Sequence, residues 1–407
     1  MEAETEKERS LQKKIKSGLC SCTRPGETAE ADALFTDDLI LEILIRLPAR
    51  SLHRFKCVSV AWRDLIADPA NRNKLPQALA GFLYMSFRSV HHHHHFASVS
   101  GGAAPFDPSL PYLQPNKYRD MEQVDACNGL LLYRACTKNL APWDWSWTED
   151  DCRFVVCNPA TGSWVELPPQ PQPQEPKGRN RIAGLAFDPA VSSHFHVLRF
   201  EEACSSSVTG VSIYSSRTGA WSHRDCVMAE EVTLFSRTRC VFVDGVLYLM
   251  GFLPRTNNDH VLLAVDMAGK VWKTISVPYA RGFAMIGSSQ GCLHYAIASF
   301  DDNNDILVSG IELWCLKDCD SKELVLKRTA SIDKFTGMTT KNYRVIGIHP
   351  DCDTIFLVPC GGHTLVVHDM QHQKVGCILD LEKNSSTQRF LPYVPLFSES
   401  LADANGR

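Results

Sequence analysis

The chain has 407 residues, of which 44% are hydrophobic and 22% are charged, and its formal net charge is -4 at pH 7. This composition is ordinary for a globular protein, and the length suits one large domain and one small one. The slight negative charge gives no overall attraction for nucleic acid or for anionic membranes, so we expect neither as a partner. The N-terminus lacks the apolar core of a secretory signal, and no apolar run of about eighteen residues occurs, so we expect an intracellular protein, in the cytoplasm, the nucleus or both.

Two short apolar stripes follow a polar tail at residues 1–33, which has no periodicity and should be flexible. Each stripe has the three-to-four-residue spacing of one helix face. The first contains Leu39, Ile43, Leu44 and Leu47, and the second contains Leu52, Phe55, Val58, Trp62 and Leu65 or Ile66. Thr36 can cap the first helix, and Pro48 ends it. Helices this short cannot bury both stripes against each other, so another protein or domain should cover the rest; the alternative is a helical cap on the domain that follows.

From about residue 80 the pattern changes to short strands separated by turns, and these strands repeat. In three copies a strand is followed by a turn that contains glycine and by a second strand that begins at tryptophan. These copies are 154–157 with Trp164, 211–214 with Trp221 and 262–265 with Trp272. Two weaker copies continue the series, 311–314 with 324–326 and 364–367 with 375–378. We therefore expect five related hairpins at intervals of about fifty residues.

Other hairpins lie between these copies. Three have a tight turn with glycine and two have a proline turn, at 128–130, 244–246, 290–292, 187–189 and 348–350. Two hairpins per period form a four-stranded sheet, and radial repetition of such sheets gives a β-propeller of kelch-like period. Five blades are visible, and Phe82, Leu83 and Tyr84 could close a sixth with residues 393–397. The alternative is two stacked β-sheets in which the tryptophans recur by coincidence.

We therefore predict a mainly β protein, in which a small α-helical module precedes a propeller of about six four-stranded blades. The module has a longer sequence pattern at 34–69, with Asp-Asp-Leu, Glu-Ile-Leu, Arg-Leu-Pro, Ser-Leu, Arg-Phe-Lys-Cys-Val-Ser and Trp in order. This segment resembles the F-box, in particular the plant form that precedes an F-box-associated domain. The resemblance implies docking on a Skp-type adaptor and, through it, on the cullin of a cullin–RING ubiquitin ligase.

The resemblance also assigns roles to residues of the two stripes. Carried over by position, the adaptor-facing or module-core residues would be Leu39, Ile43, Leu44, Leu47, Pro48, Leu52, Phe55, Val58 and Trp62. Two positions depart from the family pattern. Thr36 stands where many members have proline, and Val60 replaces the lysine common two residues before the tryptophan, which weakens any polar contact expected there.

The strand-rich region is similar to the plant F-box-associated domain through three motifs in the expected order. They are CNGLLL at 127–132, CNPATGSWVELP at 157–168 and AFDP at 186–189. The two resemblances together imply an F-box at 34–78 and an F-box-associated propeller at 79–400, between tails at 1–33 and 401–407.

The sequence has no nucleophile motif, phosphate loop, CxxC pair or HExxH, and we predict no catalytic residue, no metal and no cofactor. The run from His91 to His95 could capture a divalent metal, but a homopolymeric loop has no fixed ligand geometry. His368 and His372 flank a predicted turn, which makes a metal site there weaker still. The sixteen cysteines are scattered, and we interpret them as reduced, mostly buried small hydrophobes.

Trp143, Trp145 and Trp147 alternate with polar residues and precede an acidic run at 149–151. In a propeller the strands pack blade on blade, so recognition is left to the loops at the ends of the channel. The longest irregular stretches are 88–118, 135–153 and 168–181, and the second contains the three indoles. Aromatic side chains provide contact area and carboxylates favour a basic partner, so we place target binding here. The alternative is that the indoles cover a blade edge.

These features predict the substrate-recognition subunit of an SCF-type ubiquitin ligase, a non-catalytic protein that brings an unknown protein target to the ligase. One rival is a propeller enzyme or sugar-binding propeller with a helical cap, which would place convergent carboxylates or aromatics in the central channel. Another is an F-box scaffold that binds the adaptor without directing degradation. The solvent-facing apolar stripe favours the ligase subunit over the enzyme, and the sequence does not separate the subunit from the scaffold.

Overall fold

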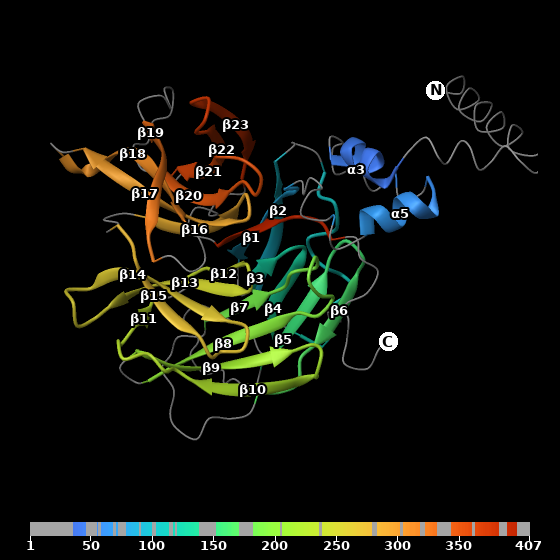
Figure 1. Ribbon diagram of the computed structural model, residues 1–407, viewed down its shortest axis with the longest axis horizontal. Coiled ribbons are helices and arrows are strands. Elements are labelled where there is room, and N and C mark those ends of the chain that lie inside the picture. The colour runs from blue at the N-terminus through green and yellow to red at the C-terminus, as the bar shows by residue number, and fades with distance from the viewer. Residues whose placement is uncertain are drawn as a thin grey trace, which may run out of the picture.

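The computed structural model of the chain describes residues 36–45, 55, 58–67, 71, 79–88, 91–99, 103–113, 117–118, 120–137, 152–170, 182–203, 206–235, 238–278, 283–301, 304–317, 322–331, 343–359, 363–381 and 389–396. Within these ranges lie two helices, α3 (Asp37–Ile45) and α5 (Val60–Ala67), and strands β1 to β24. The strands form six antiparallel sheets arranged as the blades of a propeller, and the helices lie outside the ring (Figure 1). The predicted fold, a helical module before a six-bladed propeller, is confirmed.

Each blade is named here by its strands, from the central channel outwards. Blade 1 has β24 (Phe390–Tyr393), β1 (Gly81–Arg88) and β2 (His91–Ser98). Blade 2 has β3 (Asp120–Cys127), β4 (Leu130–Cys136), β5 (Cys152–Asn158) and β6 (Ser163–Glu166). Blade 3 has β7 (Ala183–Ala186), β8 (His196–Glu202), β9 (Val208–Ser215) and β10 (Ala220–Asp225).

In blade 4 the innermost position is divided between two short strands that both pair with the next one. This blade has β11 (Thr233–Leu234) and β12 (Val241–Val243), then β13 (Val246–Leu253), β14 (Asp259–Asp266) and β15 (Trp272–Ser276). Blade 5 has β16 (Ala284–Ser289), β17 (Cys292–Asp301), β18 (Asn304–Leu316) and β19 (Leu324–Ser331). Blade 6 has β20 (Tyr343–Ile348), β21 (Thr354–Pro359), β22 (Thr364–Asp369) and β23 (Lys374–Asp380).

The ten predicted hairpins all occur, and every turn joins the strands that the sequence pattern indicated. Three inner turns have two consecutive residues with positive φ, for example 46° at Asn128 and 90° at Gly129. This is the backbone of a two-residue hairpin turn, and it explains why glycine recurs at the second position. The likeness to kelch repeats, which rested on the period alone, stays a prediction.

The two ends of the propeller domain close the ring in blade 1. Strand β1 pairs antiparallel with β24, and Leu83 lies opposite Leu391. The prediction that 82–84 closes the ring is confirmed, but the partner strand is 390–393 and not 393–397. Leu396, after the end of this strand, bonds to blade 2 instead, since its carbonyl accepts a hydrogen bond from Asn158 Nδ2 at 2.9 Å.

Trp164, Trp221 and Trp272 occupy the same place in three successive blades. Each is paired with the penultimate residue of the preceding strand, Cys157, Tyr214 and Val265 respectively. Trp272 is buried, with 9% of its surface exposed, whereas Trp164 and Trp221 are half-buried. The three tryptophans are therefore equivalent in register but not in burial.

The interpretation that every cysteine is reduced is wrong for one pair. Cys136 and Cys152 lie directly opposite each other on β4 and β5, with their Cα atoms 4.1 Å apart, and they form a disulfide. Cross-strand neighbours at this distance bring their Cβ atoms close enough to be bridged. Cys157 is free and fully buried, and burial raises its pKa to about 12, so its thiol stays protonated.

Candidate binding surfaces

The two helices of the N-terminal module begin at residues that can cap them. Thr36 Oγ1 accepts a hydrogen bond from the Leu39 N–H at 3.4 Å, and Asp37 and Asp38 in the first turn suit the dipole of α3. Ser59 Oγ accepts a hydrogen bond from the Trp62 N–H at 3.1 Å at the start of α5. The predicted capping role of Thr36 is confirmed.

The inner face of α3 packs on α5. Ile40, Leu41, Leu44 and Ile66 are buried in one apolar cluster, with Ile45, Phe55, Trp62 and Leu65 packed against it. The rings of Phe55 and Trp62 are 5.2 Å apart. Of the predicted site residues, Leu44, Phe55 and Trp62 thus lie in or against the core of the module. Ile40 and Leu41 belong to that core too, although the sequence stripe did not include them.

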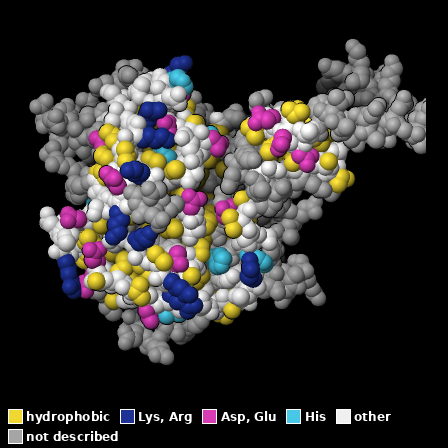
Figure 2. Space-filling model, in the orientation of Figure 1, with side chains coloured by type: hydrophobic (Ala, Val, Ile, Leu, Met, Phe, Trp, Pro, Cys, Tyr) yellow, Lys and Arg dark blue, Asp and Glu magenta, His cyan; other side chains and the backbone are white. Residues whose placement is uncertain are grey.

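The outer face of the module exposes large apolar side chains. Leu39, Ile43, Val58 and Val60 are between 40% and 63% exposed. Figure 2 shows hydrophobic side chains beside acidic ones on the surface of this module. Exposed apolar side chains close together are typical of an interaction surface. The other three predicted site residues, Leu47, Pro48 and Leu52, lie outside the described residues.

The target-binding prediction falls mostly outside the described residues. Trp143, Trp145 and Trp147 are not among them, and the structure describes only the strands on either side, β4 and β5, joined by the disulfide. The stretch 88–118 is less irregular than expected, because it contains β2. Its later part is held against blade 2, where Lys117 and Tyr118 both donate hydrogen bonds to the Glu166 carboxylate.

The histidine run lies on a strand and not in a loop, which corrects the prediction. His91 to His95 form the first five residues of β2 and pair with β1. The His95 ring stacks on Tyr84 at 5.1 Å and its Nε2 is 2.7 Å from Ser86 Oγ. His372 Nδ1 is 2.7 Å from Asp369 Oδ2. Among the described residues, no group of three or more possible metal ligands is found.

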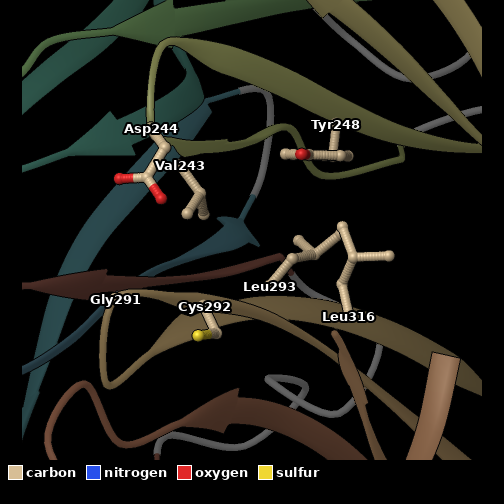
Figure 3. Close-up of a pocket in the computed structure, with 7 residues that line it drawn as sticks. All are labelled: Val243, Asp244, Tyr248, Gly291, Cys292, Leu293 and Leu316. Atoms are coloured by element: carbon tan, nitrogen blue, oxygen red, sulfur yellow. The ribbon is translucent and has the colours of Figure 1, made fainter. Parts of the chain in front are cut away.

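A small cavity of about 190 Å³ lies between blades 4 and 5 (Figure 3). It is lined by Val243, Asp244, Tyr248, Gly291, Cys292, Leu293 and Leu316. The lining contains one carboxylate and one phenol, and is otherwise apolar.

Sequence reasoning missed a group of charged residues at the innermost strands, of which Asp125 is buried and Arg239 and Arg389 are partly buried. Asp125 on β3 is 1% exposed, and Arg239 and Arg389 lie just before β12 and β24. The sequence signal was present, since each is a charged residue within or next to an apolar strand. It was not used because nothing in one strand alone shows which residues from other blades will meet it.

The comparisons with known proteins agree with the two-part architecture. Residues 34–74 match the F-box domain, and residues 108–393 match the family described as F-box protein At3g26010-like, beta-propeller. The chain is thus an F-box protein with a β-propeller. The propeller match covers more than half of the chain, which belongs to this At3g26010-like family of F-box proteins.

The similar proteins include two F-box proteins of Arabidopsis thaliana. F-box protein At5g07610 is 26% identical over 68% of this chain and 67% of its own length, and F-box protein At5g49610 is 26% identical over 87% and 93% respectively. A solved GH93 alpha-L-arabinofuranosidase of Fusarium graminearum, in complex with arabinobiose, is 15% identical, with a TM-score of 0.37 over 68% of this chain and 82% of that one. No helix within the described ranges is long and apolar enough to cross a membrane.

Proposed function

We propose that this protein is the substrate-recognition subunit of an SCF-type ubiquitin ligase. The F-box, at residues 34–78, binds a Skp-type adaptor and through it the cullin, and the propeller, at 79–400, recruits a protein target. The chain needs no catalytic residue for this role. It acts by proximity, because a held target presents its lysines at high effective concentration to the ubiquitin-loaded enzyme of the ligase.

The observation that supports adaptor binding is the outer face of the F-box. Leu39, Ile43 and Val58 are exposed above a closed apolar core, in the segment that matches the F-box domain. An apolar surface left open beside a completed core is suited to a protein partner. In the proposed complex these three side chains touch the adaptor, Leu44, Phe55 and Trp62 support them from within, and Leu47, Pro48 and Leu52 complete the surface.

The test uses the full chain and a purified Skp-type adaptor. Replacing Leu39 and Ile43 together by Asp should abolish binding, because each change places an unpaired carboxylate in an apolar contact. Val191→Asp is the matched control, since Val191 is an exposed apolar residue of the propeller. Unchanged adaptor binding by the double variant would contradict the proposal.

Target binding is proposed for the loop that contains Trp143, Trp145 and Trp147. This loop joins β4 to β5 at the end of blade 2 where β6 also leaves for β7, so two long connections start from the same face. Replacing the three tryptophans by Ser should remove target capture in a proteomic pull-down and keep adaptor binding. Recovery of the same proteins would place recognition elsewhere.

The same pull-down, made with and without proteasome inhibition, separates the ligase subunit from a non-degradative scaffold. A degraded target should accumulate when the proteasome is inhibited, and should also accumulate in cells that contain the Leu39→Asp, Ile43→Asp variant. A bound protein whose amount does not change under either condition would favour the scaffold.

A further inference from the structure

The Cys136–Cys152 disulfide closes the neck of a long connection in blade 2. Cys136 is the last residue of β4 and Cys152 is the first residue of β5, and they lie directly opposite each other with their Cα atoms 4.1 Å apart. The chain between them, residues 137–151, contains the three tryptophans proposed for target binding. The bond therefore fixes the distance between the two ends of this connection.

The disulfide is set apart from the apolar cores of the blades. Cys136 and Cys152 are 0% and 8% exposed, and they form a buried pair of their own outside the larger apolar clusters. The next pair on the same face of these strands is Arg134 and Phe154, where the guanidinium lies over the ring at 5.6 Å. Arg134 Nη1 also lies 2.6 Å from Glu122 Oε2. Opening the bond should thus loosen the ends of β4 and β5 and leave the rest of the blade paired.

Six other cysteines are protected from oxidation by burial. The thiolate is the reactive form of cysteine, and a raised pKa keeps the thiol protonated. Burial raises the pKa of Cys127, Cys157, Cys226, Cys240, Cys315 and Cys352. Among these cysteines and the bonded pair, we therefore expect thiol–disulfide chemistry to be concentrated at Cys136 and Cys152.

We propose that the Cys136–Cys152 bond is a redox-sensitive site, opened by cellular thiols and closed by peroxide, which controls how tightly the connection between β4 and β5 is held. A ubiquitin-ligase subunit would work where thiols are kept reduced, and disulfides in such compartments are usually redox-sensing or catalytic. For this setting and for its effect on target capture, the inference rests on the proposed function. The closed bond should favour target capture, since a connection with fixed ends loses less conformational entropy on binding.

Both directions are balanced two-electron steps. In the opening step, a glutathione thiolate attacks one sulfur of the bond and forms a mixed disulfide, and a second glutathione then leaves with the first as glutathione disulfide, so that both protein sulfurs become thiols. In the closing step, hydrogen peroxide oxidises one thiol to a sulfenic acid and releases water. The second thiol then displaces the hydroxyl group as a second water molecule and forms the S–S bond.

The first test equilibrates the folded full chain with mixtures of reduced and oxidised glutathione, alkylates the free thiols and identifies the Cys136 and Cys152 peptides by mass spectrometry. We expect both residues to change together and reversibly between the bridged and the alkylated form, with an unchanged circular dichroism spectrum. Cys226→Ser is the matched control and should keep this transition, since Cys226 is a free, half-buried cysteine of the propeller. A bond that stays closed in excess reduced glutathione, or never forms in excess oxidised glutathione, would overturn the proposal.

The second test is hydrogen exchange of the oxidised and the reduced chain. Reduction should lower the protection at the end of β4 and the start of β5 at least about tenfold and leave β13 and β14 unchanged. The double variant Cys136→Ser, Cys152→Ser should resemble the reduced wild type under both conditions. Equal protection of the oxidised and reduced wild type would overturn the proposal, because the bond would then not control this connection.

Target capture in a pull-down is compared between the same two forms. The oxidised chain should recover at least about threefold more target than the reduced chain, and adaptor binding should be equal in both. Equal recovery of target by the two forms would overturn the effect on recognition. If neither form captures a target, the proposed target binding fails, whereas the glutathione equilibrium and hydrogen exchange still decide whether the bond is redox-sensitive.

Discussion

The Asp125 carboxylate accepts a hydrogen bond from the Leu185 backbone N–H, with Oδ2 2.8 Å from the nitrogen. This hydrogen bond joins the inner strands of two neighbouring blades. The next turn repeats the connection, because Asn128 Nδ2 donates to the Phe187 carbonyl at 2.7 Å. Blades 5 and 6 are joined in the same way, by the Gln290 N–H and the Pro350 carbonyl at 2.6 Å. The glycine turn of one blade thus bonds to the proline turn of the next, which gives a physical reason for the order of these motifs along the chain.

The first prediction concerns the pH dependence of stability at Asp125. Burial raises its pKa from 3.8 to about 6, against the opposing effects of the Leu185 N–H and of Arg239. A carboxyl with a raised folded-state pKa binds more protons in the folded state than in the unfolded state. Its contribution to stability is therefore fully present below about pH 4, falls as the pH rises, and is lost above about pH 6. Asp125→Asn removes this titration.

The measurement is urea unfolding of wild type and Asp125→Asn at pH 5 and pH 7. The free energy of unfolding of the wild type, minus that of the variant, should fall by about 1 kcal/mol between the two pH values. Any constant cost of the substitution cancels in this comparison. A difference that stays flat, or that rises with pH, would show that Asp125 is ionised without penalty in the folded protein.

The second prediction separates the core of the F-box from its outer surface. Leu44 is fully buried, so Leu44→Ala should destabilise the module by about 2–5 kcal/mol. Leu39 is 52% exposed, and Leu39→Ala should change its stability by no more than about 0.5 kcal/mol. Hydrogen exchange of the α3 and α5 amides reports on the module alone. Equal loss of protection in both variants would contradict the assignment of the two faces.

The third prediction follows from the unequal burial of two equivalent tryptophans. Trp272 is buried and donates from Nε1 to the Gly269 carbonyl at 3.0 Å, and Trp272→Ala should cost about 3–5 kcal/mol. Trp221 is half-buried and bonds to the Pro168 carbonyl at 2.9 Å, so Trp221→Ala should cost less. Thermal unfolding of both variants gives the order, and a larger loss at Trp221 would show that burial does not decide it.

The sequence predicted most of the propeller, because its signals are local. A hairpin is specified by its turn residues and by the strands on each side, and six of the ten hairpins have glycine in the turn whereas two have proline. Ring closure was placed three residues too late, since Tyr393 to Phe397 looks like a strand in the sequence, whereas β24 ends at Tyr393 and Leu396 bonds to Asn158 of blade 2. The Cys136–Cys152 bond likewise depends on the register of β4 on β5.

The candidate sites were less predictable, for the same physical reason. The apolar stripe of α3 was recognised, but periodicity alone placed Leu44 with Leu39, although one is buried and the other exposed. The channel group of Asp125, Arg239 and Arg389 was not recognised, because its members lie in different blades. A strand pattern identifies a blade, whereas contacts between residues of different blades depend on how those blades face one another.

The last prediction tests how closely the first and last blades pack. Gly347 lies on β20, and a Cβ atom added there would stand 2.3 Å from Cε1 of Phe82 on β1. Phe82 cannot move aside easily, because it is fully buried and its ring lies 4.9 Å from that of Phe356. Gly347→Ala should therefore separate blades 6 and 1 and cost about 1–3 kcal/mol through overpacking.

Gly376→Ala is the control for this change. Gly376 lies on the outer strand β23, where the nearest atom to an added Cβ is Val367 Cγ1 at 3.1 Å, the end of a side chain that can shift. Its cost should be clearly smaller than that of Gly347→Ala in urea unfolding. Since β1 contributes Phe82 and also pairs with β24, the Gly347→Ala variant should in addition lose hydrogen-exchange protection in β1 and β24 before the other blades. Equal stability of the two variants, or uniform loss of protection around the ring, would show that the junction of blades 6 and 1 is not the sensitive point.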